Sequence, residues 1–411
     1  MTAPPSWQEQ NAQQLGAALA ELRQRLENFP RPAVPETETP AKHVETIVSS
    51  TDEPTAKAPS AMERLGERLG LSSFERNVLL LCAAMELDTR TAGLCARAQD
   101  DPQKNFPTFA LALALFDEPS WEALSPERPL RFWRLIEISQ LGAQPLTASA
   151  LRADERMVNY LKGLNQLDER LASLVSPVEF STGAAELAAA QQQLVQIILR
   201  RWRQSAETGL LPVAQLVGAD PQSKQLVAQQ TAATLHRRLY RLPVESLPTN
   251  PSELEWLARL WQRESRLLPL ALYLDADESS NSAEHAGALN RFLSRSDGVF
   301  FLGTRENLPQ VGSPHFALDI TKPTAAEQKG AWTAALGEDA HDTPAQLAGQ
   351  FNLNLPRIHE LARVAKLEAR DSNRPLTENI WEICRAGEPH VALAHGDCGI
   401  VCVGEPGAAK A

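Results

Sequence analysis

The chain has 411 residues, 43% of them hydrophobic, and carries a formal net charge of −11. This length predicts roughly two or three domains, and the acidity argues against a general nucleic-acid or anionic-membrane surface. The five cysteines are scattered without C-x-x-C spacing, which argues against a zinc site or a disulfide framework. Because there is no signal-peptide pattern and no apolar run of membrane-spanning length, we expect a cytoplasmic protein without a membrane partner.

The N-terminal region divides into two segments of different composition. Residues 1–29 are predicted to form an amphipathic helix, because apolar residues recur there at steps of three and four. The stripe consists of Leu15, Ala18, Leu19, Leu22, Leu26 and Phe29. It is expected either to pair with a partner helix or coiled coil, or to dock on the rest of the chain. Residues 30–60 are rich in Pro, Thr, Glu and Ala, which predicts a disordered linker.

Residues 61–177 are predicted to form a mainly helical domain. Ser72 and Glu75 have the spacing of a capping box, so a helix is expected to begin there. The run of residues 78–85 after this start is apolar nearly all round, which predicts a buried helix. Further helices are expected at residues 106–116 and 151–174, and a strand at residues 130–138. Several helices with a short strand or hairpin are typical of a winged-helix-like domain, which Pro177 closes.

Residues 184–320 have a different pattern, in which predicted apolar strands alternate with predicted helices. Strands are predicted at residues 211–218, 238–242, 269–275, 298–304 and 316–320, and helices at residues 184–206, 223–238, 251–266 and 283–295. Such alternation is typical of a parallel sheet covered by helices. The predicted fold class is therefore mixed α and α/β, with a doubly wound parallel sheet. Residues 321–386 are expected to form a helical lid, and residues 387–411 a tail.

A glycine and a lysine lie in and after the loop that follows the first predicted strand of the sheet. Gly218 and Lys224 match the phosphate loop G-x-x-x-x-G-K-[ST]. Ser223 replaces the second glycine, and Gln225 replaces the magnesium-binding hydroxyl. The strand before and the helix after are the context of a nucleotide loop at a helix N-terminus. A glycine and a lysine at this spacing also occur by chance, so a purely structural loop is the competing interpretation.

Further positions along the chain have the residue types of a nucleotide site. Asp275 ends an apolar strand, where an aspartate can hold magnesium. Ala276 stands where a water-activating glutamate is expected, and Glu278 is displaced from that position. Thr304 ends the next strand, where it could position water, and Arg357 is near the start of a helix in the expected lid. Each of these residues alone also has a structural explanation, as an acidic loop, a strand cap or a surface arginine.

Taken in order along the chain, these signals resemble an AAA+ module at residues 211–369, which is a nucleotide-binding α/β domain followed by a helical lid. Upstream segments resemble the N-terminal winged-helix-type domain of a bacterial AAA+ ATPase family associated with contractile injection systems, the phage-tail-like particles. These segments are residues 71–88, 107–113, 129–138, 145–147 and 151–156. The resemblance covers about residues 6–385. It implies the N-terminal part of such an ATPase, with a degenerate first AAA+ module.

The resemblance implies a protein with two AAA+ modules. The first module is commonly degenerate, and the second, C-terminal module carries intact motifs. The end of the chain reads as a strand running into another phosphate-loop frame. Gly404 and Lys410 match that frame, whereas Ala409 and Ala411 replace the glycine and the hydroxyl residue. We expect a truncation, a frameshifted reading frame or a divergent remnant of the motif there, rather than a working nucleotide site.

Ser223, Gln225 and Ala276 together weaken the loop, the metal ligand and the base that ATP hydrolysis needs. The resemblance therefore implies a non-hydrolysing ATPase homologue that acts on injection-system components, or in its own oligomer, during assembly or remodelling. Weakly bound ATP with magnesium, held through Lys224, is the one cofactor implied, and no separate metal site is expected. Two alternatives stay open. One is an ATP-binding regulator or weak oligomeric ATPase; the other is a winged-helix DNA-binding regulator, against which the acidic charge argues.

Overall fold

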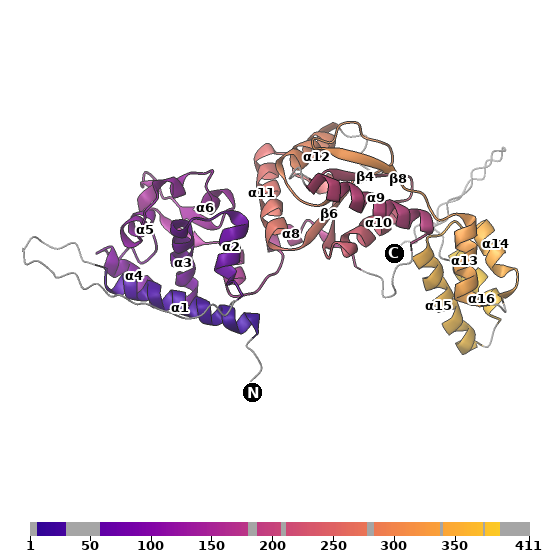
Figure 1. Ribbon diagram of the computed structural model, residues 1–411, viewed down its shortest axis with the longest axis horizontal. Helices are drawn as coiled ribbons and strands as arrows, with labels where there is room; N and C mark the ends of the chain where they lie inside the picture. Colours follow the sequence, from indigo (N-terminus) through magenta and orange to yellow (C-terminus); the bar gives the residue numbers. More distant parts are fainter. Residues whose placement is uncertain are drawn as a thin grey trace, which may run out of the picture. The chain divides into compact units, whose positions relative to one another are not determined.

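The computed structural model describes residues 6–29, 58–179, 187–206, 211–277, 283–337, 340–372 and 375–386. Most of the expected linker and all of the expected tail lie outside these residues. The chain divides into two compact units (Figure 1). The first unit comprises residues 1–180 and 194–320, and the second comprises residues 181–193 and 321–411. Among the described residues, no helix combines the length and the apolar character that crossing a membrane requires.

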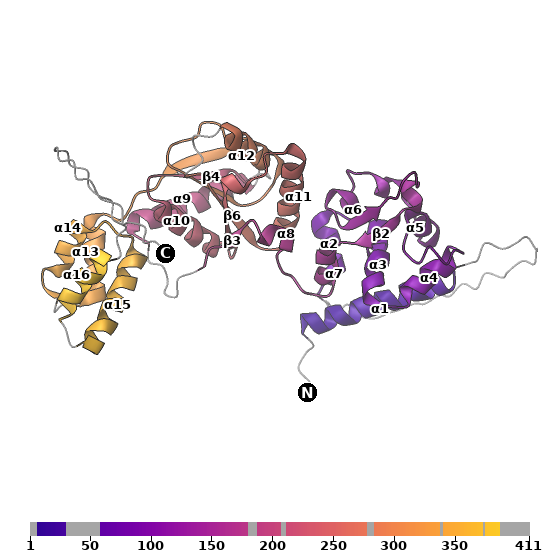
Figure 2. The ribbon, with the colours of Figure 1, turned by 180° about the vertical axis from the view of Figure 1, so that it is seen from behind.

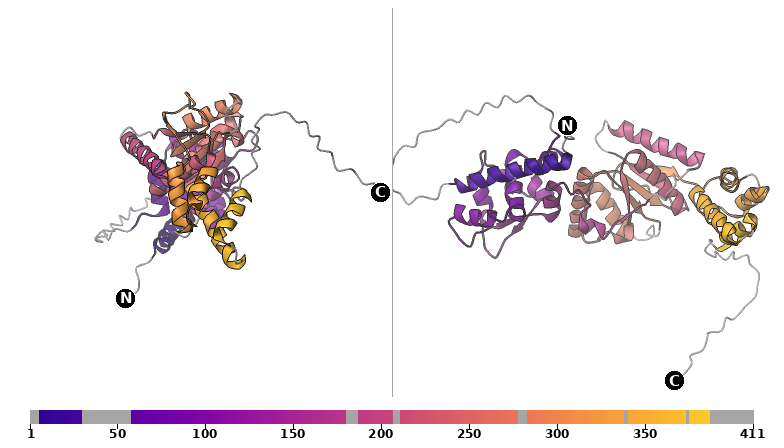
Figure 3. Two further views of the ribbon diagram at one scale, coloured as in Figure 1. Left: turned by 90° about the vertical axis from the view of Figure 1, so that its right-hand side faces the viewer. Right: turned by 90° about the horizontal axis from the view of Figure 1, so that it is seen from below.

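The first helix of the chain, α1 (Trp7–Glu27), docks on its own chain. It packs against α4 (Thr91–Ala98) and α3 (Ser73–Leu87), and Figure 3 shows it as the indigo helix at the surface of the N-terminal domain. The apolar stripe is buried in this contact, since Leu22 and Leu26 are 4% and 1% exposed. Of the two expectations for this helix, docking on the rest of the chain is the one observed.

The rest of the N-terminal domain consists of short helices around a two-stranded sheet. Its further elements are α2 (Ala61–Leu69), α5 (Phe109–Leu115), η1 (Trp121–Leu124), α6 (Pro129–Phe132), β1 (Ile136–Ser139), η2 (Leu146–Ala148), β2 (Ala150–Ala153), α7 (Glu155–Leu161) and α8 (Glu169–Ala172). The predicted capping box is confirmed at the start of α3. The Glu75 backbone N–H donates to the Ser72 hydroxyl at 3.2 Å, and the Ser72 N–H donates to the Glu75 carboxylate at 2.9 Å.

Two predicted elements of this domain are wrong in part. The strand predicted at residues 130–138 begins only at Ile136, because Pro129 starts the short helix α6 and suits its first position. The helix predicted at residues 151–174 is interrupted, since Leu151 lies in β2 and pairs antiparallel with β1. Leucines at helical spacing are compatible with either structure, and the pairing partner, which is distant in sequence, decides between them.

The remainder of the first unit is built on a six-stranded sheet with the order β3-β5-β6-β7-β4-β8. Its strands are β3 (Ser176–Pro177), β4 (Val213–Val217), β5 (Arg238–Pro243), β6 (Leu270–Asp275), β7 (Phe300–Thr304) and β8 (His315–Asp319). All of its pairings are parallel except that of β3 with β5. The predicted fold class, mixed α and α/β with a doubly wound and mostly parallel sheet, is confirmed. The antiparallel edge strand β3 was not predicted.

Helices cover both faces of this sheet (Figure 2). They are α9 (Ala189–Ala206) and α10 (Pro221–Thr234) on one face, and α11 (Pro251–Leu267) and α12 (Ala283–Arg295) on the other. Neighbouring phenylalanines of β7 show the alternation. The Phe301 ring packs on Trp202 of α9, with centroids 5.2 Å apart, whereas the Phe300 ring packs on Phe292 of α12 at 6.1 Å. Successive side chains of one strand thus serve two cores, as a sheet buried on both faces requires.

The described residues between 325 and 386 in the second unit are mostly helical, in agreement with the helical lid of the predicted fold class. Its helices are α13 (Ala325–Leu336), α14 (Thr343–Gln350), α15 (Leu355–Ser372) and α16 (Leu376–Ala386). Thr324 and Glu327 form a capping box at the start of α13. The core of this unit is apolar, with Trp332 and Ile358 fully buried.

Two cysteines of the N-terminal domain are expected to resist alkylation in the folded chain. Cys82 and Cys95 are 0% exposed, and burial raises the pKa of Cys95 to about 12 and that of Cys82 still further. At pH 8 only about one Cys95 thiol in ten thousand is a thiolate, which is the reactive form. After treatment with iodoacetamide, peptide mass mapping should find both residues unmodified in the native chain and alkylated in urea. Equal labelling in both conditions would contradict this burial.

Candidate functional site

The carboxyl ends of β4, β6 and β7 meet at one edge of the sheet. β4 lies between β7 and β8, and its connection through α10 leads to β5, beyond β7 and β6. The chain therefore leaves the neighbouring strands β4 and β7 in opposite directions, and such a switch point is where ligands bind in open α/β sheets. The predicted residues Gly218, Asp275 and Thr304 lie at or directly after these strand ends. Lys224 reaches the same place from α10.

The loop between β4 and α10 is short and consists of residues 218–220. α10 begins at Pro221, which is earlier than predicted, and proline suits a first helical position. Asp220 caps this helix, since its carboxylate accepts a hydrogen bond from the Ser223 N–H at 2.8 Å. Lys224 thus lies in the first turn of α10. A carboxylate of the chain itself occupies the helix N-terminus, where a phosphate group would bind.

The glycine of the motif has a structural reason of its own. Gly218 has a φ of 157°, and a Cβ at this position would lie 2.3 Å from the carbonyl oxygen of Ile320. The Ile320 N–H donates to the Val217 carbonyl at 2.7 Å, so the chain after β8 closely follows the end of β4. Glycine is required here for the approach of two backbones.

The lysine of the motif is paired inside the protein. Lys224 is 0% exposed. Its ammonium donates to the carbonyl oxygens of Gly218 at 2.8 Å and of Thr304 at 3.0 Å, and to the carboxylate of Asp277. A lysine ammonium has three donors, so these three acceptors use all of them. Asp277 is itself only 6% exposed and compensates the buried charge.

The aspartate at the end of β6 is also paired. The Arg241 guanidinium, from the neighbouring strand β5, donates to one carboxylate oxygen of Asp275 at 2.8 and 2.6 Å. The Asp277 backbone N–H donates to the other oxygen at 3.3 Å. The carboxylate predicted to hold magnesium is therefore already charge-compensated by an arginine.

The threonine at the end of β7 points its polar atoms into the sheet. The Thr304 hydroxyl is hydrogen-bonded to the side-chain amide of Gln215 at 3.2 Å, and both residues are fully buried. The Thr304 carbonyl accepts from the Gly218 N–H at 3.0 Å, in addition to Lys224. These bonds engage the side chain that was predicted to position water.

The structure describes two further predicted residues, Gln225 and Arg357. Gln225 follows Lys224 on α10 and is half-buried. Arg357 belongs to the second unit, where its guanidinium donates to the Glu360 carboxylate at 2.7 Å. Glu278 lies outside the described residues.

The geometry of this edge does not fit a magnesium nucleotide. The donors of Lys224 are used, Asp220 caps the helix N-terminus, and Arg241 compensates Asp275. The early start of α10 could have been found from the sequence, because Asp followed by Pro is a typical cap and first helical residue. The pairing of Lys224 with Asp277 could not, since these residues are 53 positions apart.

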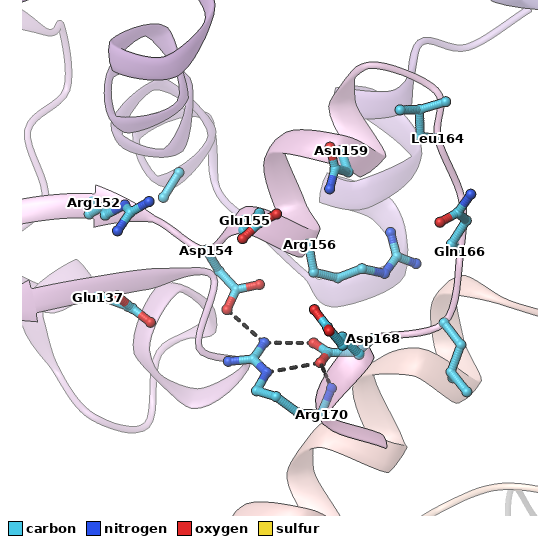
Figure 4. A pocket seen from close by; sticks show the side chains of 13 residues that line it. Glu137, Arg152, Asp154, Glu155, Arg156, Asn159, Leu164, Gln166, Asp168 and Arg170 are labelled. Atoms are coloured by element: carbon cyan, nitrogen blue, oxygen red, sulfur yellow. Dashed lines mark hydrogen bonds and ion pairs between the residues drawn. The ribbon is translucent and has the colours of Figure 1, made fainter. Parts of the chain in front are cut away.

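A second cluster of charges lies where the N-terminal domain meets α11. Figure 4 shows part of it, with Asp154, Arg156, Asp168 and Arg170. We call it the junction cluster. It contains three carboxylates and three guanidinium groups, from Asp154, Asp168, Glu264, Arg156, Arg170 and Arg263. A groove of about 430 Å³ opens beside it. None of these six residues was predicted as functional from the sequence.

Arg263 is the innermost cation of the junction cluster. It is 0% exposed and donates to the carboxylates of Asp168 and Glu264, the latter at 3.2 Å. Arg156 donates to the second oxygen of Glu264 at 3.0 Å. Burial raises the pKa of Glu264, and the charges of Arg263 and Arg156 oppose this shift. The positive charges of the two arginines therefore offset only part of the effect of burial on the pKa of Glu264.

Arg170 links the two aspartates of the cluster, as Figure 4 shows. Its guanidinium donates to Asp154 at 2.7 Å and to Asp168 at 2.6 Å. Burial alone would raise the pKa of Asp168, but the hydrogen bonds from Arg170 and the charge of Arg263 outweigh it and leave the pKa lowered. Every charge of the cluster has a partner of opposite sign, which is how buried ions are tolerated. Its arrangement is that of a structural joint between α11 and the N-terminal domain.

A mainly helical N-terminal domain is followed along the chain by a doubly wound sheet with a lysine and an aspartate at its switch point, and then by a helical segment. This is the order of elements that the resemblance to an AAA+ module implied. Residues 5–175 match the family described as a winged helix domain, variant. Residues 324–389 match the contractile injection system ATPase helical domain. The chain therefore contains one segment that matches a winged helix domain and one that matches the helical domain of contractile injection system ATPases, in agreement with the resemblance stated from its sequence.

Solved structures of AAA+ proteins are also similar to this chain. The AAA domain of FIGL-1 in complex with ADP is 17% identical, with 56% of this chain and 93% of that chain covered and a TM-score of 0.38. A RuvB mutant from Thermotoga maritima is 15% identical, with 48% and 70% covered and a TM-score of 0.36. At these scores neither similarity carries an argument about binding or activity. No curated protein matches the chain.

Proposed function

We propose that this chain is a non-hydrolysing module of a contractile injection system ATPase, which acts through protein contacts in assembly or remodelling of the particle. Its partners would be components of that system or further copies in an oligomer. The match of residues 324–389 to the helical domain of such ATPases supports the proposed role in a contractile injection system. The pseudo-ATPase character is argued from the switch point of the sheet.

The observation that carries the proposal is the internal pairing of Lys224. In a working phosphate loop this ammonium reaches the β- and γ-phosphates. Here it is fully buried and donates to Gly218, Thr304 and Asp277 instead. For a nucleotide to bind Lys224, the ion pair with Asp277 would first have to be broken and a carboxylate left buried, which costs several kcal/mol.

The alternative of an ATP-binding regulator needs the same lysine and is less well supported for that reason. The motif also lacks a hydroxyl for magnesium, since Gln225 follows the lysine. A DNA-binding regulator draws support only from the winged helix domain, and fold alone does not define function. The net charge of −11 opposes it.

The purified chain is expected to show neither ATP hydrolysis nor a nucleotide-dependent rise in melting temperature. With a dissociation constant above about 10 mM, magnesium-ATP at about 1 mM would stabilise the fold by less than about 0.1 kcal/mol. Differential scanning fluorimetry with ATP and ADP, with and without magnesium, measures this directly. An established phosphate-loop ATPase, run in parallel, shows that the assay detects binding.

The Asp277→Asn variant makes this experiment sharper. It weakens the internal partner of Lys224 without changing the size of the side chain. If the wild-type chain shows a clear shift with magnesium-ATP, the non-hydrolysing proposal loses its main support and the ATP-binding alternative replaces it. A shift in the variant alone would show that the internal ion pair is what excludes the nucleotide.

A further inference from the structure

The N-terminal domain has an apolar groove between its two short 3-10 helices. The groove has a volume of about 430 Å³ and lies between η1 and η2. Trp121, Leu124, Pro145 and Leu146 supply its apolar lining. Leu124 is 5% exposed and anchors the floor, whereas Trp121 is 68% exposed and forms an open wall. An indole exposed to this extent beside an apolar groove is unusual for a residue that only stabilises a fold.

Exposed carboxylates lie in η1 and next to it in the sequence. Glu122 lines the groove, whereas Glu118 comes three residues before Trp121 and Glu127 two residues after Ser125. Glu118, Glu122 and Glu127 are exposed, and none of them forms an ion pair with another described residue. The nearest arginines in sequence are engaged elsewhere. Arg128 donates to the buried Glu75 at 3.1 Å, and Arg131 donates to the Leu124 carbonyl at 2.6 Å. The groove therefore has a mostly apolar lining with the carboxylate of Glu122, and further exposed carboxylates flank η1 in the sequence.

We propose that this groove is a docking site for a basic amphipathic segment of a protein partner. An aliphatic side chain of the partner would pack on Trp121 in the groove, and lysine or arginine residues beside it would meet Glu118, Glu122 and Glu127. Large aromatic residues dominate the binding energy of such contacts, and complementary charges steer the encounter. An anionic membrane or a nucleic acid is repelled by the same three carboxylates.

Charge also argues against occupants from this chain itself. A second copy docked by the same surface would bring like charges together, because a two-fold contact pairs a patch with itself. The segment of residues 30–57 contains three lysine or arginine residues against five aspartate or glutamate residues. Residues 387–411 contain one lysine against three acidic residues. Neither segment has the net positive charge that would be attracted to Glu118, Glu122 and Glu127.

Two designed peptides test this proposal with the full chain. One is an amphipathic Leu/Lys peptide of about 18 residues, and the other replaces every lysine by glutamate and keeps the leucine spacing. In isothermal titration calorimetry the Leu/Lys peptide should bind with one-to-one stoichiometry and the Leu/Glu peptide should not bind. Raising the salt concentration should weaken the binding, because exposed charges are screened.

The variants locate the binding on the groove. Trp121→Ala should weaken the Leu/Lys peptide about tenfold or more, as loss of a central aromatic contact does. Charge reversal at Glu118, Glu122 and Glu127 together should abolish the preference for the basic peptide. Leu164→Ala, at a leucine that is 54% exposed elsewhere, and Glu67→Lys are the matched controls and should leave the affinity unchanged.

Three results would overturn the proposal. The first is equal affinity for the two peptides, and the second is equal affinity of the wild-type chain and the Trp121→Ala variant. The third comes from sedimentation velocity: if Trp121→Ala converts a self-associated chain into monomers, the groove is a contact between copies. Circular dichroism of each variant confirms that it is folded, which is expected because these side chains are exposed.

Discussion

Replacing Lys224 by methionine is expected to lower the free energy of unfolding by about 3–5 kcal/mol. Methionine replaces much of the aliphatic stem but leaves the Asp277 carboxylate, which is 6% exposed, without its cation. It also leaves the carbonyl oxygens of Gly218 and Thr304 without their donor. Urea unfolding at pH 7 measures the loss, and hydrogen exchange of the β4 and β7 amides assigns it to the sheet.

Two comparisons separate a structural lysine from a ligand-binding one. Lys366→Met, at an exposed position of α15, should change stability by no more than about 0.5 kcal/mol. The double variant Lys224→Met with Asp277→Leu should recover much of the loss, because an apolar pair can replace a buried ion pair. If Lys224→Met were no more harmful than Lys366→Met, Lys224 would have no structural role and would be free for a nucleotide.

Replacing Arg263 by alanine is expected to lower the free energy of unfolding by a similar amount, about 3–5 kcal/mol. The substitution leaves two buried carboxylates, Asp168 and Glu264, short of positive charge. Without Arg263 the pKa of Glu264, already raised by burial, should rise further. Protonation then removes one uncompensated charge, so the loss of stability should be smaller near pH 5 than near pH 8.

A neighbouring arginine on the same helix is the control for this second prediction. Arg259 lies one turn before Arg263, pairs with Glu255 at 3.0 Å and is partly exposed. Arg259→Ala should cost no more than about 1 kcal/mol, as is usual for exposed ion pairs. Urea unfolding of both variants at the two pH values gives the comparison. Equal effects of the two variants would show that the junction cluster does not stabilise the domain contact. A large loss for Arg263→Ala that does not depend on pH would contradict the expected rise in the pKa of Glu264.

Local patterns were sufficient for much of the fold. The capping box at Ser72 and Glu75 was read correctly, because its bonds join residues three apart. The apolar strands of the sheet were also placed within a few residues, since a strand buried on both faces is a short continuous apolar run. The errors fell where a distant partner decides, as at Leu151, whose pairing with β1 overrides its helical spacing.

The candidate site shows the same division. Gly218 and Lys224 were singled out from their spacing, and the structure places both near the switch point of the sheet. Their partners were not found, because Ile320 and Asp277 come from segments far away in sequence. Knowing which residues occupy a motif therefore did not reveal whether their polar atoms were free.

The sequence by itself determined the order of the elements, the fold class and the family resemblance, because periodicity, caps and motif spacing are local properties. Only the tertiary structure decided how the charges are used. Lys224, Asp275 and Arg263 each meet a partner that folding brings in from a distant segment. A buried charge must be compensated, and in this chain the compensation comes from its own side chains and backbone.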